Sequence, residues 1–313
     1  MIEYRRLREK YSILELCKTP ELAAQVTMQP IDRFDLDAAI IFADILLPLE
    51  PMGLSLEFAE GEGPIIHNPV RDRAAVDRLK VMDDGGLQYV MDAISLTRTM
   101  LAGRVPLIGF AGAPFTLASY AIEGGSSRNY IHTKQMMYGE PEVWHRLMDT
   151  FARVITGYLR RQIKAGAQAV QLFDSWVGCL SAGDYAEYVM PHVQLIFDGL
   201  KHEGVPLIHF GTGTTAILKS MRQAGGDVIG IDWRIPLDEA WAMVGHDRAV
   251  QGNLDPVALF APIPEIERRV ADILRRAGGR PGHIFNLGHG ILPNTPVEHV
   301  AATIDLVHRL SKT

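Results

Sequence analysis

Polar side chains follow several short apolar runs in this chain, at points where they could act on a bound molecule. The first is Asp44, which stands in the run Phe42-Ala43-Asp44-Ile45. A carboxylate among apolar residues loses its hydration at a large cost unless several hydrogen-bond donors meet it. Asp44 is therefore a candidate site residue, and the alternative is a structural aspartate bonded to the backbone.

The apolar run that starts at Pro106 leads to a second set of candidates. Tyr120 follows this run, and the loop from Glu123 to Tyr130 carries Arg128 among glycine and serine residues. A loop of this composition could be a mobile lid that brings a cation to a ligand. The alternatives are a core aromatic side chain for Tyr120 and a solvated loop charge for Arg128.

Two further candidates are Ser175, in Phe173-Asp174-Ser175-Trp176, and His289, in Asn286-Leu287-Gly288-His289-Gly290. A serine nucleophile would need a base and an oxyanion hole, and the glycines that flank a nucleophile elbow are missing. Ser175 is therefore interpreted as a hydrogen-bond donor or a helix cap. Glycines on both sides of His289 let the backbone approach a ligand and expose the ring, although a lone histidine is more often structural or merely exposed.

Sequence motifs for metals, nucleotides and redox chemistry are missing. The chain has no His-x-Cys or His-Glu-x-x-His pattern. The segment Gly211-Thr212-Gly213-Thr214 is neither a P-loop nor a dinucleotide fingerprint. Cys17 and Cys179 make no disulfide framework and no paired-cysteine metal site, so we expect buried small hydrophobes there. The motifs therefore predict neither a cofactor nor a metal.

The composition limits the class of partner. The 31 basic residues stand against 37 acidic ones, which gives a net charge of −6 and no global basic field for nucleic acid. No apolar run reaches the length of a membrane span, and the first six residues contain no apolar signal core. We therefore expect a cytoplasmic protein that binds neither nucleic acid nor a membrane.

The apolar runs themselves predict buried strands. Each run is largely apolar rather than alternating, which is typical of a parallel sheet covered by helices. The seven candidates are Ala38–Asp44, Pro106–Ala111, Ala169–Asp174, Pro206–Gly211, Val228–Asp232, Ala249–Asn253 and His283–Gly288. Because helical patterns lie between them, the chain is expected to form a parallel α/β fold.

Three helical patterns are clear enough to name. The first is an amphipathic stripe with apolar residues at spacings of three and four, made by Val143, Leu147, Phe151, Val154 and Tyr158. Thr295-Pro296-Val297-Glu298 predicts a helix start with Thr295 as the cap and a capping box, and Thr19-Pro20-Glu21 predicts a similar start.

The strand count bears on the architecture. In an α/β barrel, chemistry lies at the carboxyl ends of the strands, so the candidate side chains would meet on one face. A closed barrel needs eight strands and seven are readable, whereas an open doubly wound sheet would tolerate seven. Leu54–Ala59 is not the eighth, because no helix separates it from the strand ending at Asp44. No repeat, low-complexity stretch or linker is visible, so residues 1–313 are expected to form one domain.

These residues resemble those of the uroporphyrinogen decarboxylase family. The resemblance rests on five segments in the family's order, and it covers nearly the whole chain. The segments are Phe42–Leu46 with Met52-Gly53-Leu54, Gly109–Leu117 with Tyr120 and Glu123-Gly124-Gly125, Gln171–Ser175, Gln251–Pro256 and Asn286–Gly290. The resemblance implies a (β/α)8 TIM barrel that converts uroporphyrinogen III, a tetrapyrrole, to coproporphyrinogen III without a cofactor or metal.

The resemblance also implies roles for the candidates. Asp44 would accept hydrogen bonds from the central pyrrole N–H groups, and its charge would stabilise a protonated ring. Tyr120 and Ser175 would bind substrate carboxylates, and His289 would make a further substrate contact. The two remaining assignments are Phe173, as the apolar wall of the site, and Arg128, as a cation for the carboxylates. Members of the family are commonly homodimers.

The chain departs from the family at one point. Family members begin with a strand that ends in Met-Arg-Gln-Ala-Gly-Arg-Tyr-Leu-Pro, and its two arginines bind substrate carboxylates. That motif would lie before Met1, and the first barrel strand is the one that the strand count does not find. We therefore expect the natural protein to be longer and this form to be impaired. The alternatives are an inactive porphyrinogen-binding protein and a corrinoid-linked methyltransferase of the same superfamily, which would bind zinc through histidine and cysteine.

Overall fold

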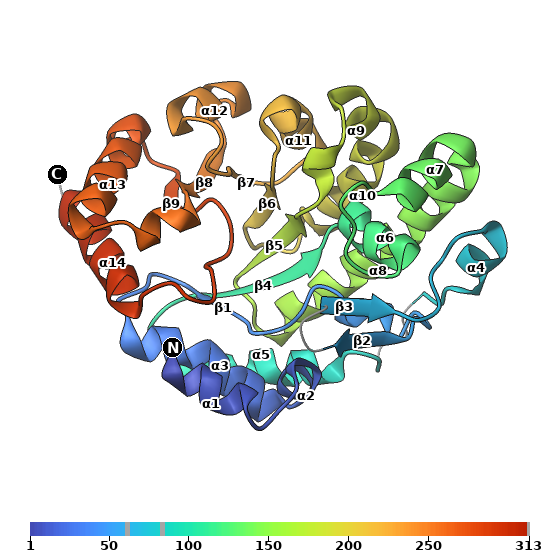
Figure 1. Ribbon diagram of the computed structural model, residues 1–313, viewed down its shortest axis with the longest axis horizontal. Helices are drawn as coiled ribbons and strands as arrows, with labels where there is room; N and C mark the ends of the chain where they lie inside the picture. Colours follow the sequence, from blue (N-terminus) through green and yellow to red (C-terminus); the bar gives the residue numbers. More distant parts are fainter. Residues whose placement is uncertain (60–62, 82–84, 312–313) are drawn as a thin grey trace.

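A curled sheet of seven parallel strands forms the centre of the computed structural model, which describes residues 1–59, 63–81 and 85–311 (Figure 1). The strands lie in the order β1-β4-β5-β6-β7-β8-β9, and each neighbouring pair is parallel. Their bounds are β1 Ala39–Ile40, β4 Leu107–Gly112, β5 Ala169–Asp174, β6 Leu207–Gly211, β7 Val228–Gly230, β8 Ala249–Leu254 and β9 His283–Leu287. The predicted parallel, barrel-like α/β fold is confirmed.

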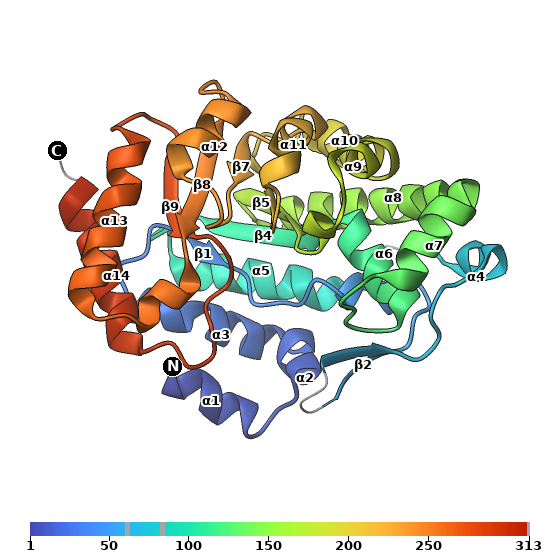
Figure 2. The same cartoon turned by 45° about the horizontal axis from the view of Figure 1, so that its top comes forward.

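Helices cover the outer face of this sheet (Figures 1 and 2). The longer ones are α3 Pro20–Arg33, α5 Gln88–Leu101, α8 Pro141–Ala165, α10 Met190–Leu200, α13 Ile263–Ala277 and α14 Val297–Ser311. The shorter helices, of which α1, α2, α4 and α7 pack mainly on other helices, are α1 Ile2–Arg8, α2 Ile13–Lys18, α4 Arg73–Arg78, α6 Pro114–Glu123, α7 Ile131–Gly139, α9 Ala182–Tyr188, α11 Leu218–Ala224 and α12 Leu237–Val244. Among the described residues, no helix has both the length and the apolar composition that crossing a bilayer would need.

The packing of α8 against the sheet follows from its sequence. All five apolar residues of the predicted stripe, from Val143 to Tyr158, are buried. The helix ends at Gly166, whose positive φ of 119° suits a residue without a side chain. The amphipathic pattern therefore predicted both the helix and the face that it buries.

Strand β1 is much shorter than its apolar run. The prediction of a strand through Asp44 is wrong, because pairing with β4 ends at Ile40. The last backbone hydrogen bond to β4 comes from the N–H of Ile41, which donates to the carbonyl of Ile108 at 3.0 Å. The next N–H, that of Phe42, donates instead to the hydroxyl of Thr27 on α3 at 2.8 Å. The strand therefore ends at Ile40, and Asp44 lies outside the sheet.

A glutamine side chain makes the hydrogen bonds to β4 that β1 is too short to make. The buried amide of Gln162, on α8, accepts from the N–H of Phe110 at 2.8 Å and donates to its carbonyl at 2.7 Å. A Cβ at Gly109 would lie 2.3 Å from Oε1 of Gln162, so a side chain there would displace this amide from its bonds to Phe110. The glutamine thus satisfies the N–H and the carbonyl of Phe110, which a neighbouring strand would otherwise satisfy, and the glycine leaves room for its amide.

The segment after β1 forms a separate hairpin. Strands β2 (Leu56–Ala59) and β3 (Gly63–Ile66) are antiparallel to each other and form a two-stranded sheet of their own. The interpretation of Leu54–Ala59 as an excursion rather than a barrel strand is confirmed.

The predicted helix starts have different outcomes. Helix α3 begins at Pro20 after Thr19, as expected, although the side chain of Thr19 makes no capping bond. The prediction of a capping box at Thr295 is wrong. Helix α14 begins at Val297, and the hydroxyl of Thr295 is buried without a hydrogen-bond partner among the described residues. The N–H of Thr295 donates to the carbonyl of Leu292, so a local turn holds this residue instead.

Within the described residues, β1 and β9 are the two edges of the sheet. Each edge carries an exposed isoleucine, Ile40 at 44% and Ile284 at 43%. A side-chain contact links the two ends of the sheet outside the strands. Nε2 of His308, on α14, lies 3.3 Å from Oδ2 of Asp37, in the segment that leads into β1. We call the space between these two strand edges the seam.

Candidate active site at the strand ends

Asp44 lies just beyond β1, in the turn that leads to the buried short helix Leu47–Leu49. Its carboxylate is half-buried, and Oδ1 accepts from the N–H of Leu46 at 2.8 Å. Burial raises the pKa of Asp44, and the bond from Leu46 opposes that increase. The second oxygen has no hydrogen bond to the described residues, so it is available to a ligand.

Tyr120 is carried by helix α6. This helix starts immediately after β4, with Pro114 in its first turn, and it buries Tyr120 to 9% exposure. Burial raises the pKa of the Tyr120 phenol, and the negative charge of Asp44 raises it further, whereas the side chains of Trp176 and Ser126 lower it. The Tyr120 ring also packs on Trp176, with 5.9 Å between centroids. Asp44 and Tyr120 lie at the same end of the sheet, since a Cβ at Gly112, just before α6, would lie 3.1 Å from the Cβ of Ile45.

Ser175 lies in sequence between the buried Asp174 and Trp176, whose ring packs on Tyr120. It follows β5, is half-buried, and makes no hydrogen bond to the described residues with its hydroxyl. The N–H of Trp176 donates to the hydroxyl of Thr116 at 3.3 Å, which joins the end of β5 to the start of α6. The predicted role of a helix cap for Ser175 is wrong, because the short helix that follows starts after Trp176. The hydroxyl remains available as a donor.

Asp174 is a buried carboxylate that the sequence interpretation passed over. It is 0% exposed, its Oδ1 accepts from the hydroxyl of Thr116 at 2.8 Å, and its Oδ2 has no partner among the described residues. Burial raises its pKa to about 7, against the effect of Thr116. The signal that identifies Asp44, a carboxylate at the end of an apolar run, also applies to Asp174.

A row of aromatic rings crosses the strand ends and links Phe173 to His289. Phe173 lies 5.5 Å from Phe110 on β4 and 5.7 Å from Phe210 on β6. Phe210 in turn lies 6.4 Å from the ring of His289, which is exposed. Phe173 and His289 thus share one surface, and neither Phe110 nor Phe210 was predicted as part of it.

The glycine beside His289 is required by packing. Gly288 is buried, and a Cβ there would lie 2.5 Å from the backbone nitrogen of Trp233. Its N–H donates to the carbonyl of Leu254 at the end of β8. The loop after β9 is therefore pressed against the ends of β7 and β8, and this contact fixes where His289 emerges.

Arg128 lies on the loop that follows α6. It is exposed and makes no hydrogen bond or ion pair to the described residues. The loop is tied to the hairpin, since the N–H of Ile66 donates to the carbonyl of Gly124 at 2.8 Å and Ile65 bridges to Gly125. Movement of this loop as a lid would therefore also involve β3. Arg128 is two residues from Ser126, whose side chain lowers the pKa of Tyr120.

Both cysteines are covered by other residues. Cys17 is buried, and burial together with the charge of Asp44 raises its thiol pKa to about 12. Cys179 is half-buried, and burial raises its thiol pKa to about 11. Both thiols are therefore uncharged at neutral pH. Over the described ranges, no three His, Cys, Asp or Glu side chains gather closely enough to hold a metal ion.

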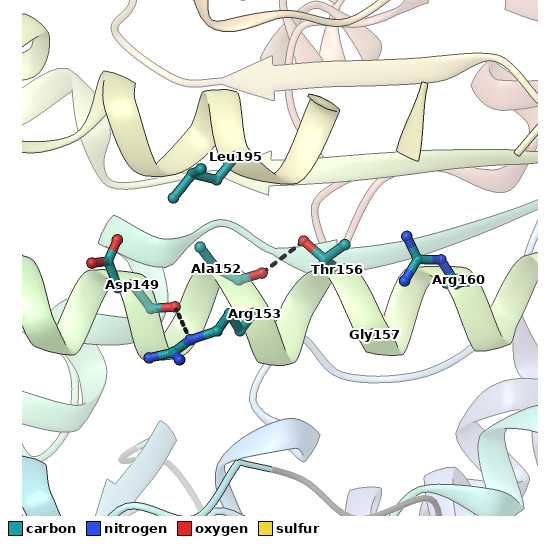
Figure 3. Close-up of a pocket in the computed structure, with 7 residues that line it drawn as sticks. All are labelled: Asp149, Ala152, Arg153, Thr156, Gly157, Arg160 and Leu195. Atoms are coloured by element: carbon teal, nitrogen blue, oxygen red, sulfur yellow. Dashed lines mark hydrogen bonds between the residues drawn. The ribbon is translucent and has the colours of Figure 1, made fainter. Parts of the chain in front are cut away.

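A cavity of about 590 Å³ lies on the outer helical layer, away from these residues (Figure 3). It is lined by α8 and by Leu195 of α10, and it contains both Asp149 and Arg153, whose side chains carry opposite charges. None of the predicted site residues lines it. The candidate site is thus the surface at the strand ends.

The fold is shared with solved structures of low sequence identity. A methyltransferase from Methanosarcina mazei superposes with a TM-score of 0.81 at 19% identity, over 94% of this chain and 87% of that one. A B12-independent methionine synthase from Shewanella sp. W3-18-1 gives a TM-score of 0.62 at 10% identity, over 94% and 86%. At such identities the likeness concerns the fold alone.

Sequence relatives are much more similar. The uroporphyrinogen decarboxylase of Sorangium cellulosum is 62% identical over 313 residues, which are 100% of this chain and 89% of the relative. That of Carboxydothermus hydrogenoformans is 57% identical over 312 residues, 99% of this chain and 89% of the relative. The model of the uroporphyrinogen decarboxylase (URO-D) family matches residues 1–310. The chain therefore belongs to the uroporphyrinogen decarboxylase family.

Proposed function

We propose that this protein removes the four acetate carboxylates of uroporphyrinogen III and so produces coproporphyrinogen III in tetrapyrrole biosynthesis. Relatives between 52% and 62% identical over nearly the whole chain carry the name of this enzyme. The observation at the site that best supports the proposal is the half-buried carboxylate of Asp44, with one oxygen free for a ligand.

The chemistry needs an electron sink rather than a cofactor. When an acetate side chain loses carbon dioxide, the electron pair of the broken C–C bond must move into the pyrrole ring, and a ring protonated at carbon can accept it. For each acetate, one carboxylate leaves as carbon dioxide and one proton takes its place on the new methyl group. The protein must therefore stabilise a cationic ring and hold the other carboxylates in place.

In this proposal Asp44 supplies the stabilising charge. Its Oδ2 accepts hydrogen bonds from pyrrole N–H groups, and the ionised carboxylate stabilises the protonated ring at short range. Because burial raises the pKa of Asp44, the ionised and active form increases as the pH rises through that pKa. A favourable environment for a cation is thus built before the substrate arrives.

The remaining roles concern binding. Tyr120 and Ser175 offer hydroxyl donors to substrate carboxylates, and His289 makes a further contact across the aromatic row. Phe173 forms the apolar wall on which the macrocycle rests. Arg128 supplies a cation, which a substrate with eight carboxylates requires from a protein of net charge −6.

The decisive experiment compares Asp44→Asn with the wild-type protein on uroporphyrinogen III under reducing conditions. We expect kcat/KM to fall by at least about a hundredfold, because loss of one preorganised electrostatic group costs roughly that much. Asp198→Asn is the matched control, since the side chain of Asp198 is 72% exposed on α10. An Asp44→Asn variant within tenfold of the wild type would contradict the proposed role.

Binding measurements separate the second candidate function. A protein that binds porphyrinogen tightly but forms no coproporphyrinogen would be the non-catalytic binding protein. The match of the family model to residues 1–310 and the 62% identity to a uroporphyrinogen decarboxylase favour the enzyme and give no sign of impairment. Zinc in the purified protein, together with methyl transfer, would support a methyltransferase instead.

The seam between β1 and β9 favours pairing with a further strand. Two parallel edges with exposed isoleucines are suited to accept one, and an eighth strand would complete a closed barrel. The expectation that the family's two arginines lie on such a strand stays a prediction. It is tested by comparing this 313-residue chain with a form extended at its N-terminus by that motif. Equal rates of decarboxylation would refute the expected impairment.

Three further proposals concern the whole molecule: residues 1–313 form one domain, the protein is cytoplasmic, and it is a homodimer. The first is supported by the continuous sheet order from β1 to β9. Light scattering on the purified protein measures the oligomeric state, and a single unfolding transition in calorimetry is the expected result for one domain.

A further inference from the structure

The segment Asp232-Trp233-Arg234 follows β7 and has no part in the proposed chemistry. Asp232 is 1% exposed, and its carboxylate is surrounded by donors. It accepts from the N–H of Gly213 at 2.5 Å, from the N–H of Arg234 at 3.1 Å and from Nη1 of Arg234 at 2.5 Å. A buried carboxylate with three such bonds is firmly held, and it holds Arg234 in turn.

Trp233 fixes the other face of this arginine. The guanidinium of Arg234 lies over the Trp233 ring, 4.0 Å from its centroid. The same ring meets His289 edge to face, with 6.4 Å between centroids and 83° between planes. Trp233 therefore stands between Arg234 and His289, so the arginine extends the aromatic row of the strand-end surface.

The donors of Arg234 are only partly used. A guanidinium carries five N–H donors, and the only side-chain bond of Arg234 to the described residues is the one to Asp232. Its side chain is 48% exposed. Because the carboxylate and the indole already fix its position, binding a ligand would cost little side-chain entropy. Arg234 thus presents to solvent a guanidinium group that is fixed in position and has N–H donors without a partner among the described residues; we call this group the fork.

The position of this fork relative to Asp44 matches a large ligand. In the sheet order, β7 is four places from β1, so the segment that carries Arg234 leaves the sheet across the strand-end surface from Asp44. With neighbouring strands about 4.8 Å apart in a curled sheet, this separation is on the order of 15 Å. A macrocycle whose N–H groups face Asp44 would bring carboxylates on its periphery towards that side.

We infer that Arg234 binds a carboxylate at the periphery of the tetrapyrrole substrate. This inference rests on the proposed function and names a binding residue in addition to those above. The geometry of the guanidinium fork suits a carboxylate, which it can bind through two parallel hydrogen bonds. Asp232 and Trp233 act as positioning residues for it.

Arg268 provides a matched control. Arg234 and Arg268 line one cavity of about 260 Å³ beside α13. Arg268 bonds Glu265 through two nitrogens, both at 2.7 Å, so its fork is occupied. Replacing Arg268 removes the same charge from nearly the same region without removing the free donors. A general electrostatic effect would change both variants equally.

The first test is steady-state kinetics on uroporphyrinogen III. We expect Arg234→Gln to raise KM by about tenfold, which converts to about 1.4 kcal/mol, with kcat within twofold of the wild type. Arg234→Lys should recover part of this loss, and Arg268→Gln should leave KM unchanged. An unchanged KM in Arg234→Gln would overturn the inference. So would a fall in kcat and melting temperature with no change in KM, which is the result expected of a purely structural arginine.

The second test does not require turnover. Fluorescence titration with uroporphyrin III, which has eight carboxylates, and coproporphyrin III, which has four, gives Kd directly. An Arg234→Gln variant that binds both about tenfold more weakly places the guanidinium on a propionate, and one that weakens only uroporphyrin places it on an acetate. Equal affinities for wild type and variant would overturn the inference. If the wild type binds uroporphyrin but releases no carbon dioxide from uroporphyrinogen III, the proposed decarboxylation fails while the role of Arg234 is still measured.

Discussion

Replacement of Asp174 by asparagine should change how the stability of this protein depends on pH. The carboxyl of Asp174 is fully buried, and burial raises its pKa from 3.8 to about 7. The unfolded chain therefore gives up this proton first as the pH rises. The stability associated with Asp174 is complete below pH 3.8 and is lost progressively up to about pH 7.

The magnitude follows from linkage. Each pKa unit corresponds to 1.36 kcal/mol, so the full cost of ionising Asp174 in the folded protein is about 4 kcal/mol. About 3 kcal/mol of this cost develops between pH 5 and pH 8. Asparagine keeps the acceptor for Thr116 and has no such cost, but its amide would place an unpaired donor at Oδ2, which costs about 1–3 kcal/mol at every pH.

Urea unfolding followed by tryptophan fluorescence measures this effect. We expect the unfolding free energy of Asp174→Asn, relative to the wild type, to increase by about 3 kcal/mol between pH 5 and pH 8. Asp198→Asn, at an exposed position, should show no such change. A difference between variant and wild type that stays within about 1 kcal/mol over this range would refute the reasoning from burial.

Three further outcomes are expected. Gln162→Leu should lower the unfolding free energy by about 2–4 kcal/mol in urea, because it leaves the N–H and carbonyl of Phe110 unpaired in the core; a loss below about 1 kcal/mol would contradict this. Gly288→Ala should raise KM and lower the melting temperature, since its Cβ would lie 2.5 Å from Trp233 N; unchanged kinetics would refute it. Burial lowers the pKa of His209 to about 4, so about 3 kcal/mol of stability should be lost as the pH falls from 6.5 towards 4. His209→Leu should remove this dependence, as urea titrations at both ends of the range would show.

The strands could be predicted because burial on both faces leaves a direct mark in the sequence. Strand β5 has the predicted bounds, Ala169–Asp174, and all seven apolar runs became strands of one sheet. Strand β1 shows the limit of this signal. An apolar run reports burial but not pairing, and Phe42 is diverted to the hydroxyl of Thr27 on a helix. That diversion depends on a tertiary contact, which periodicity does not record.

The sequence allowed individual site residues to be predicted, but not the contacts between them. Asp44 and Tyr120 were both named from sequence, yet only the structure shows that the charge of one raises the pKa of the other. The aromatic row was missed because Phe110, Phe173 and Phe210 come from three different strands. Each ring has an ordinary place in its own apolar run. Their alignment depends on the register between strands, which a single sequence does not encode locally.

The glutamine on α8 allows a very short strand within the wall of the barrel-like sheet. A strand that leaves a sheet early exposes backbone groups of its neighbour, which must then find other partners. Here one side-chain amide completes the hydrogen bonding of Phe110, so β1 can turn away after two paired residues without leaving polar groups bare. Gln162 thus replaces the hydrogen bonds that a longer β1 would make to Phe110, and Gly109 leaves room for its amide. The same pair of residues could be copied into a designed barrel to end an edge strand early.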